Sequence, residues 1–153
     1  MADTIPFDVS AAHKYFSAEN FNRTWELIEK SERTDEENLA MLHNAIASLW
    51  HWSQREDVSA KPLSVGYWQV SRVYNIIQQP SLARTYGLQA LKHAASLDPF
   101  YKGYACETLA RAEMQSGNRV IMLEYLNQAR SFAQQVTQDE DKQLLLRDLE
   151  SIQ

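Results

Sequence analysis

The most constraining feature of this sequence is a series of helix-length segments separated by very short turns. Apolar residues recur every three or four positions along most of the chain, the spacing that gives a helix one buried face. The four glycines and four prolines in 153 residues are too few for the frequent turns of a sheet-rich fold. Because helices joined by about two to four residues pack antiparallel to their neighbours, the sequence predicts an all-α fold of helical hairpins.

Capping and turn residues set the boundaries of the predicted helices. Asp8 or Ser10 begins a helical region over 8–31, but the apolar stripe loses phase near Asn20, so one bent helix and two short helices both stay open. The later helices are predicted over 34–53, 62–79, 82–97, 98–116, 119–136 and 139–152, with the longest loop over 54–61. The helix over 34–53 is predicted to face the core with Leu39, Leu42, Ile46, Leu49 and Trp50.

Two parts of the chain show a degenerate repeat pattern. In the first, Tyr67, Val70, Ser71 and Tyr74 stand at the four defined positions of the signature W-x2-L-G-x2-Y. Small residues then recur on the next helix at Ala83 and Ala90. The second part starts 39 residues later and contains Leu109, Ala110, the turn Gly117-Asn118, and Ala129. Small side chains at these positions predict close crossings between neighbouring helices.

This pattern resembles that of tetratricopeptide-repeat proteins. The segments 47–52, 71–74, 90–94 and 109–112 are also similar to a group of small bacterial tetratricopeptide-like proteins that have no assigned activity. The resemblance implies a right-handed superhelix of antiparallel hairpins with about seven or eight helices. It further implies a single domain over 1–153, with the helix over 139–152 as the cap that closes the solenoid.

The resemblance also implies a binding groove on the concave face, lined by the first helix of each hairpin. The positions that would line it are Trp68, Arg72 and Asn75 on one hairpin, and Tyr104, Glu107 and Arg111 on the next. An aromatic ring beside guanidinium groups suits a peptide or a carboxylate, because arginine offers a planar fork of donors. Two alternatives stay open. Glu107 and Arg111 form an ordinary surface ion pair, or Arg72 and Glu107 pair across adjacent hairpins.

The sequence shows no catalytic or metal-binding pattern. His43 and His51 are about two helical turns apart, too far to share one ion, and His93 lies on another predicted helix. Cys106 occupies a repeat position that is normally packed, which predicts a buried and unreactive thiol. We therefore predict no catalytic residue, no metal site and no cofactor.

Charge and hydropathy narrow the range of partners. A formal net charge of -5 and the lack of a Lys/Arg run argue against nucleic-acid binding. No apolar stretch is long enough for a signal peptide or a membrane span, which favours the cytoplasm. The sequence favours a non-enzymatic module that binds a protein or peptide partner, or a second copy of itself, through the concave face. The alternatives are a small-molecule or metal-dependent helical enzyme that uses His51 or His93 with Glu107, and a homodimeric structural protein.

Overall fold

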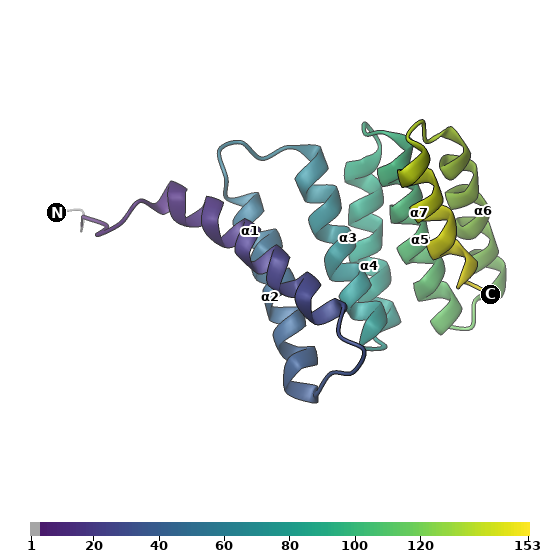
Figure 1. Cartoon of the computed structure of the whole chain (residues 1–153), viewed down its shortest axis with the longest axis horizontal. Helices are drawn as coiled ribbons and strands as arrows, with labels where there is room; N and C mark the ends of the chain where they lie inside the picture. Colours follow the sequence, from purple (N-terminus) through teal and green to yellow (C-terminus); the bar gives the residue numbers. More distant parts are fainter. Residues whose placement is uncertain (1–3) are drawn as a thin grey trace. The chain divides into compact units, whose positions relative to one another are not determined.

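The computed structural model describes residues 4–153, and in this range it contains seven α-helices and no strand (Figure 1). The helices are α1 (Val9–Ile28), α2 (Asp35–Ser53), α3 (Ala60–Ile76), α4 (Pro80–Ala94), α5 (Pro99–Gln115), α6 (Arg119–Gln135) and α7 (Asp139–Glu150). The all-α prediction is confirmed, and the later helices agree with their predicted boundaries to within a few residues. The region over 8–31, which the sequence left open, contains one helix.

The chain divides into two compact units by its internal contacts. The first unit extends to Ser59 and contains α1 and α2, and the second unit begins at Ala60 and contains α3 to α7. Within each unit, helices that follow one another along the chain pack as neighbours. The single domain over 1–153 implied by the resemblance stays a prediction.

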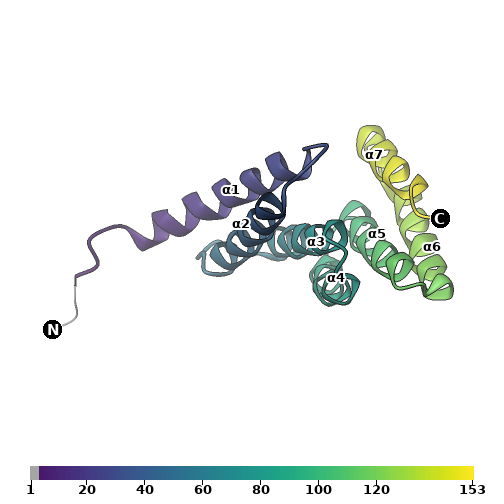
Figure 2. The same ribbon diagram turned by 90° about the horizontal axis from the view of Figure 1, so that it is seen from below.

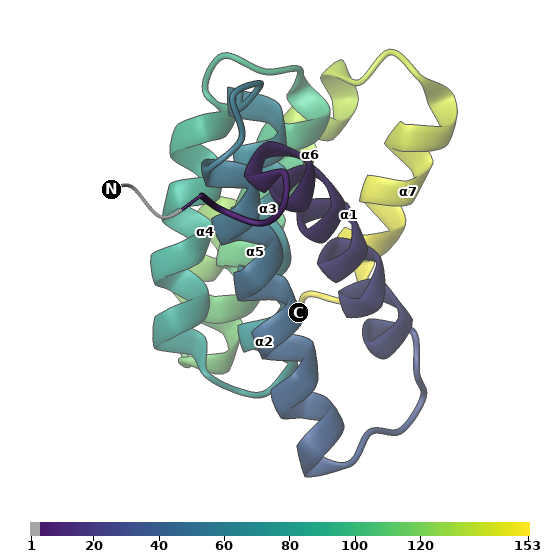
Figure 3. The same ribbon diagram turned by 90° about the vertical axis from the view of Figure 1, so that its left-hand side faces the viewer.

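The first unit is a helical hairpin of α1 and α2 (Figure 3). A side chain caps the start of each helix. Asp8 caps α1, because its Oδ1 accepts a hydrogen bond of 3.0 Å from the backbone N–H of Ala11. Thr34 caps α2 in a capping box: the Glu37 N–H donates to Thr34 Oγ1, and the Thr34 N–H donates to the Glu37 carboxylate. The sequence left Asp8 or Ser10 open for α1 and Thr34 or Asp35 open for α2, and the structure selects the first residue of each pair.

The buried face of α2 agrees only in part with the predicted one, and Leu49 is buried as expected. Leu39 and Trp50, which were expected in the core, are 53% and 54% exposed, so their placement in the core was wrong. The buried residues of α2 are Met41, Ala45, Ser48 and Leu49. Ser48 contacts α1 directly, since its hydroxyl donates a hydrogen bond of 2.7 Å to the Ser17 carbonyl. Such a contact brings the two helices together on the side of α2 that carries small residues.

The second unit is built around α5, which packs against α3, α4, α6 and α7. Figure 2 shows α4 on the opposite side of α3 and α5 from α7. The small residues predicted at helix crossings are all fully buried, and they are Ser71, Ala83, Ala90, Ala110 and Ala129. The Ser71 hydroxyl donates to the Ala83 carbonyl at 2.7 Å, which fixes the crossing of α3 and α4. The predicted burial of these small residues is confirmed.

The end of α5 follows the predicted turn. Gly117 has a φ of 75°, the left-handed conformation that glycine adopts without a steric penalty. The Asn118 N–H then donates to the Glu113 carbonyl at 3.0 Å, which satisfies one of the last carbonyls of the helix. Among residues 4–153, none of the helices combines the length and the apolar composition needed to cross a membrane.

Candidate functional site

Five of the six residues predicted to line a groove form a connected group on α3 and α5. We call this group the α3/α5 face, and it comprises Trp68, Arg72, Tyr104, Glu107 and Arg111. The rings of Trp68 and Tyr104 meet edge to face, with centroids 5.4 Å apart. The Arg72 guanidinium carbon lies 5.7 Å from the centroid of the Trp68 ring, within range of a cation–π interaction. The four side chains other than Glu107 are partly exposed.

Glu107 is the most unusual member of this face, because its carboxylate is buried. Its side chain is 1% exposed, and Oε1 accepts a hydrogen bond from Arg111 Nε. The other oxygen, Oε2, is buried and has no hydrogen-bond partner among residues 4–153. A buried carboxylate oxygen without a donor is energetically unfavourable, so native structures contain few of them. The predicted Glu107–Arg111 pair exists, but it differs from an ordinary pair on an exposed helix surface.

Helix α7 closes one end of the α3/α5 face. The Tyr104 hydroxyl donates a hydrogen bond of 2.7 Å to Asp148 Oδ2. Arg111 Nη2 donates to the Asp148 carbonyl at 2.7 Å and to Ser151 Oγ at 2.8 Å. Burial, together with the bond to Asp148, raises the pKa of Tyr104 far above its ordinary value, so its hydroxyl stays a donor. Arg111 thus joins Glu107 to the last turn of α7.

Asn75, the sixth predicted groove residue, lies in the packing between helices. It is 6% exposed, and its Nδ2 donates to both the carbonyl and the hydroxyl of Thr108, at 3.0 Å each. The Gln115 side chain donates in turn to the Asn75 carbonyl at 2.9 Å. Asn75 therefore joins α3 to α5 and does not belong to the exposed face.

The histidines of the enzyme alternative occupy separate environments. His93 stacks on Tyr67, with ring centroids 5.4 Å apart and planes 7° from parallel. In the first unit, His51 Nδ1 lies 2.9 Å from Nδ1 of His13. Burial, and then the charge of His13, lower the pKa of His51 below its ordinary value. The described part of the chain contains no group of three or more His, Cys, Asp or Glu residues that could hold a metal ion.

Cys106 has the environment that the sequence predicted. Its side chain is fully buried in a core cluster that includes Ala110, Leu126 and Leu145. Burial raises the pKa of its thiol to about 11, so the thiolate is scarce at neutral pH. The predicted burial of the Cys106 sulfur is confirmed.

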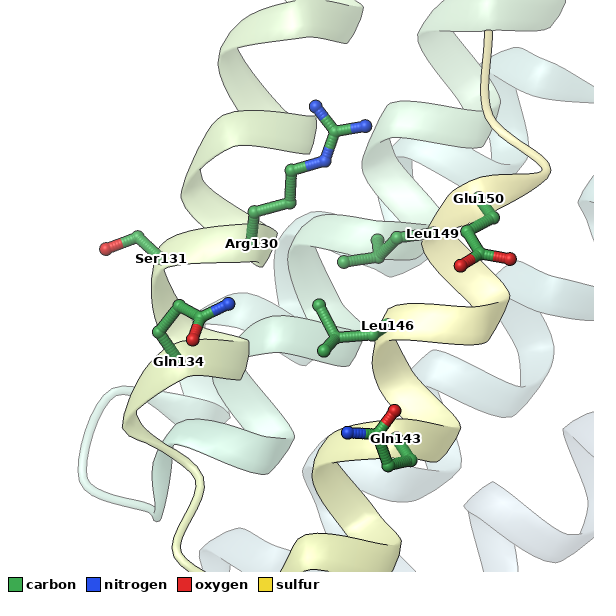
Figure 4. A pocket seen from close by; sticks show the side chains of 7 residues that line it. All are labelled: Arg130, Ser131, Gln134, Gln143, Leu146, Leu149 and Glu150. Carbon is green, nitrogen blue, oxygen red and sulfur yellow. The ribbon is translucent and has the colours of Figure 1, made fainter.

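A pocket that the sequence did not predict lies between α6 and α7 (Figure 4). Its volume is about 460 Å³, and its lining consists of Arg130, Ser131, Gln134, Gln143, Leu146, Leu149 and Glu150. Figure 4 shows the first three on one helix and the other four on the helix that faces it. A smaller pocket of about 350 Å³ lies beside the start of α5 and the connection from α6 to α7. Neither pocket includes a residue of the α3/α5 face.

Comparison with known proteins gives no assignment. No family model matches this chain, and neither a curated protein nor a solved structure matches it. The tetratricopeptide resemblance therefore stays a prediction, and function is inferred from the side chains of the chain itself.

Proposed function

We propose that this chain is a non-enzymatic interaction module that binds a peptide segment of a partner protein through the α3/α5 face. The observation that carries the proposal is the buried Glu107 Oε2, which lacks a donor although the other carboxylate oxygen pairs with Arg111. Buried carboxylates of purely structural pairs usually have both oxygens bonded, because an orphan oxygen costs the full desolvation penalty of its group. A ligand that donates to Oε2 removes this penalty on binding.

A peptide segment matches the mixture of groups on this face. Its backbone N–H is the donor that Glu107 Oε2 lacks, and its carbonyl or carboxylate oxygens accept from the guanidinium groups. The edge of Trp68 and its contact with Tyr104 supply an apolar wall for a ligand side chain. Donors, an acceptor and an aromatic wall within one group of side chains favour a peptide over a purely apolar ligand.

Access to Glu107 requires a movement, because its side chain is almost completely covered. Arg111 is the side chain placed to move: it is 21% exposed, and it bonds to Glu107 on one side and to α7 on the other. In this proposal the ligand shifts Arg111 from Glu107 and takes over part of its bonding. The last turn of α7 then limits how far the ligand extends along the face.

The tetratricopeptide superhelix belongs to the same proposal. The fully buried small residues at Ser71, Ala83, Ala90, Ala110 and Ala129 support it, because close crossings at such positions are what stack hairpins in these folds. A cytoplasmic location stays a prediction. The enzyme alternative and the homodimer alternative stay hypotheses, and we propose neither.

The proposal is tested by selecting peptides from a random display library on the purified chain. Selected peptides are titrated against wild type, Trp68→Ala, Arg72→Ala and Glu107→Gln, with Lys92→Ala on the exposed side of α4 as the matched control. We expect each variant of the face to weaken binding at least about tenfold, the loss expected when a good charged or aromatic contact is removed. Lys92→Ala should bind as wild type does.

Two results would overturn the proposal. One is a selection that yields no peptide binding to the chain. The other is a set of peptides that bind Trp68→Ala, Arg72→Ala and Glu107→Gln as tightly as wild type, which would place the binding surface elsewhere. Circular dichroism of each variant separates lost binding from lost folding.

A further inference from the structure

The first unit carries a pair of imidazoles that belongs to no site described above. His13 on α1 and His51 on α2 approach each other through the same ring atom, with Nδ1 2.9 Å from Nδ1. The two residues are 38 positions apart in the sequence, so the hairpin and not local chain geometry brings them together. Both are partly buried, and their ring centroids lie 5.0 Å apart.

The separation of these nitrogens can be compared with the geometry of metal centres. Imidazole nitrogens bind first-row divalent metals at about 2.0–2.1 Å. Two such nitrogens lie about 2.9 Å apart when the angle at the metal is a right angle, and about 3.3 Å apart when it is tetrahedral. The observed 2.9 Å is the length of the hydrogen bond that joins the unliganded rings, and it is close to the right-angle spacing. Right angles are typical of the tetragonal centres of Cu²⁺ and Ni²⁺, whereas Zn²⁺ prefers the tetrahedral arrangement.

The surrounding rings hold both imidazoles in place. Trp50 contacts His51 with centroids 4.9 Å apart and His13 with centroids 5.4 Å apart. Phe16 contacts the His51 ring at 5.4 Å. Ligands that are fixed before the metal arrives lose less conformational entropy on binding. Because Trp50 and Phe16 are 54% and 44% exposed, the cluster also borders solvent.

From this geometry we infer that His13 and His51 form a two-histidine clamp for a divalent transition metal, with Cu²⁺ as the preferred ion. Both rings bind as neutral imidazoles through Nδ1. The ring that donates its Nδ1 proton in the unliganded pair changes tautomer and carries that proton on Nε2, so each Nδ1 offers a lone pair. No third His, Cys, Asp or Glu joins the pair among residues 4–153, so water fills the other positions. The site is therefore open and exchangeable.

The clamp links α1 to α2, which gives metal binding a structural consequence. A metal that binds the folded hairpin and not the unfolded chain stabilises the folded state by mass action. The preference for Cu²⁺ follows from the Irving–Williams order, which places Cu²⁺ above Ni²⁺ and Zn²⁺. This inference does not depend on the α3/α5 face, which belongs to the second unit.

The test is titration of the purified chain with Cu²⁺ by calorimetry, in a buffer that does not coordinate Cu²⁺. Wild type, His13→Asn and His51→Asn are compared with His43→Asn, an exposed histidine on the same helix α2. We expect one Cu²⁺ per chain for wild type and for His43→Asn, and binding at least about tenfold weaker when either clamp residue is replaced. Zn²⁺ should bind wild type more weakly than Cu²⁺ does.

Electron paramagnetic resonance of the wild-type complex gives a readout that does not depend on the folding of a variant. Two coordinating nitrogens should split the copper signal, and His43→Asn should leave the spectrum unchanged. The inference is overturned if wild type binds no Cu²⁺, if His13→Asn and His51→Asn bind it as wild type does, or if the spectrum lacks the nitrogen splitting.

Discussion

Both units bury large aliphatic side chains, but the first unit also leaves several aromatic side chains exposed. In the second unit the core contains large aliphatic residues, and Leu109 and Leu145 are fully buried. In the first unit several of the largest apolar side chains are outside, with Tyr15 60% and Trp50 54% exposed. The contact between α1 and α2 includes the serine pair Ser17 and Ser48. Small-residue spacing located helix contacts of the second unit, whereas apolar periodicity only partly located the buried face of α2 in the first.

The largest expected effect comes from making the same substitution in both units. Leu145→Ala removes a fully buried side chain from the cluster of α5, α6 and α7, and we expect it to lower the free energy of unfolding by about 2–5 kcal/mol. Leu39→Ala removes a side chain that is 53% exposed, and we expect a change within about 0.5 kcal/mol. Urea denaturation followed by circular dichroism measures both. Equal losses of unfolding free energy in Leu145→Ala and Leu39→Ala would mean that the two units do not differ in how they bury these leucines.

A second prediction concerns the close crossings of the second unit. Ala110 is fully buried on α5, so Ala110→Leu must force its neighbours apart, and we expect a loss of about 1–3 kcal/mol. Ala95→Leu is the matched control, because Ala95 is exposed just after α4. Thermal unfolding compares the two variants. An unchanged melting temperature for Ala110→Leu would mean that the space around Ala110 accommodates a leucine without displacing the neighbouring helices.

Much of the fold followed from local signals in the sequence. The caps at Asp8 and Thr34 and the turn at Gly117 act through backbone groups within a few residues. Sequence alone therefore identified the turn and narrowed each cap to two candidates. The buried face of α2 did not follow, because large apolar residues occur on more than one side of this helix. Tertiary packing selected the side with Ala45 and Ser48, which periodicity alone does not rank.

The contacts of the candidate sites were likewise only partly predictable from the sequence. Repeat register placed Trp68 and Tyr104 on one face, and their rings do meet. The register did not reveal that Asn75 bonds to Thr108, because that contact depends on the distance between α3 and α5. Likewise His13 carried no signal in the sequence. Its pairing with His51 spans two helices, and no local motif encodes it.

The smallest expected effect compares one buried and one exposed ion pair. Glu113 is 3% exposed, and its hydrogen bond from Arg84 lowers the pKa of its carboxyl group below the ordinary value. A lowered pKa in the folded state stabilises the chain above the ordinary pKa of 4.5, and this stability is lost as the pH falls through the folded value. Glu113→Gln should therefore reduce stability by about 1 kcal/mol at neutral pH and by nothing once the carboxyl group is protonated in both states.

The control for this comparison is Glu19→Gln in the first unit. Its partner Arg23 is 59% exposed, and exposed pairs of this kind contribute little to stability. Urea midpoints measured from neutral to acidic pH should converge for wild type and Glu113→Gln, and should coincide throughout for wild type and Glu19→Gln. Divergence at acidic pH would assign the effect of Glu113 to packing and not to its charge. In that case Glu113 would stabilise the second unit through packing, as its apolar residues do. Ion pairing would then not distinguish the two units.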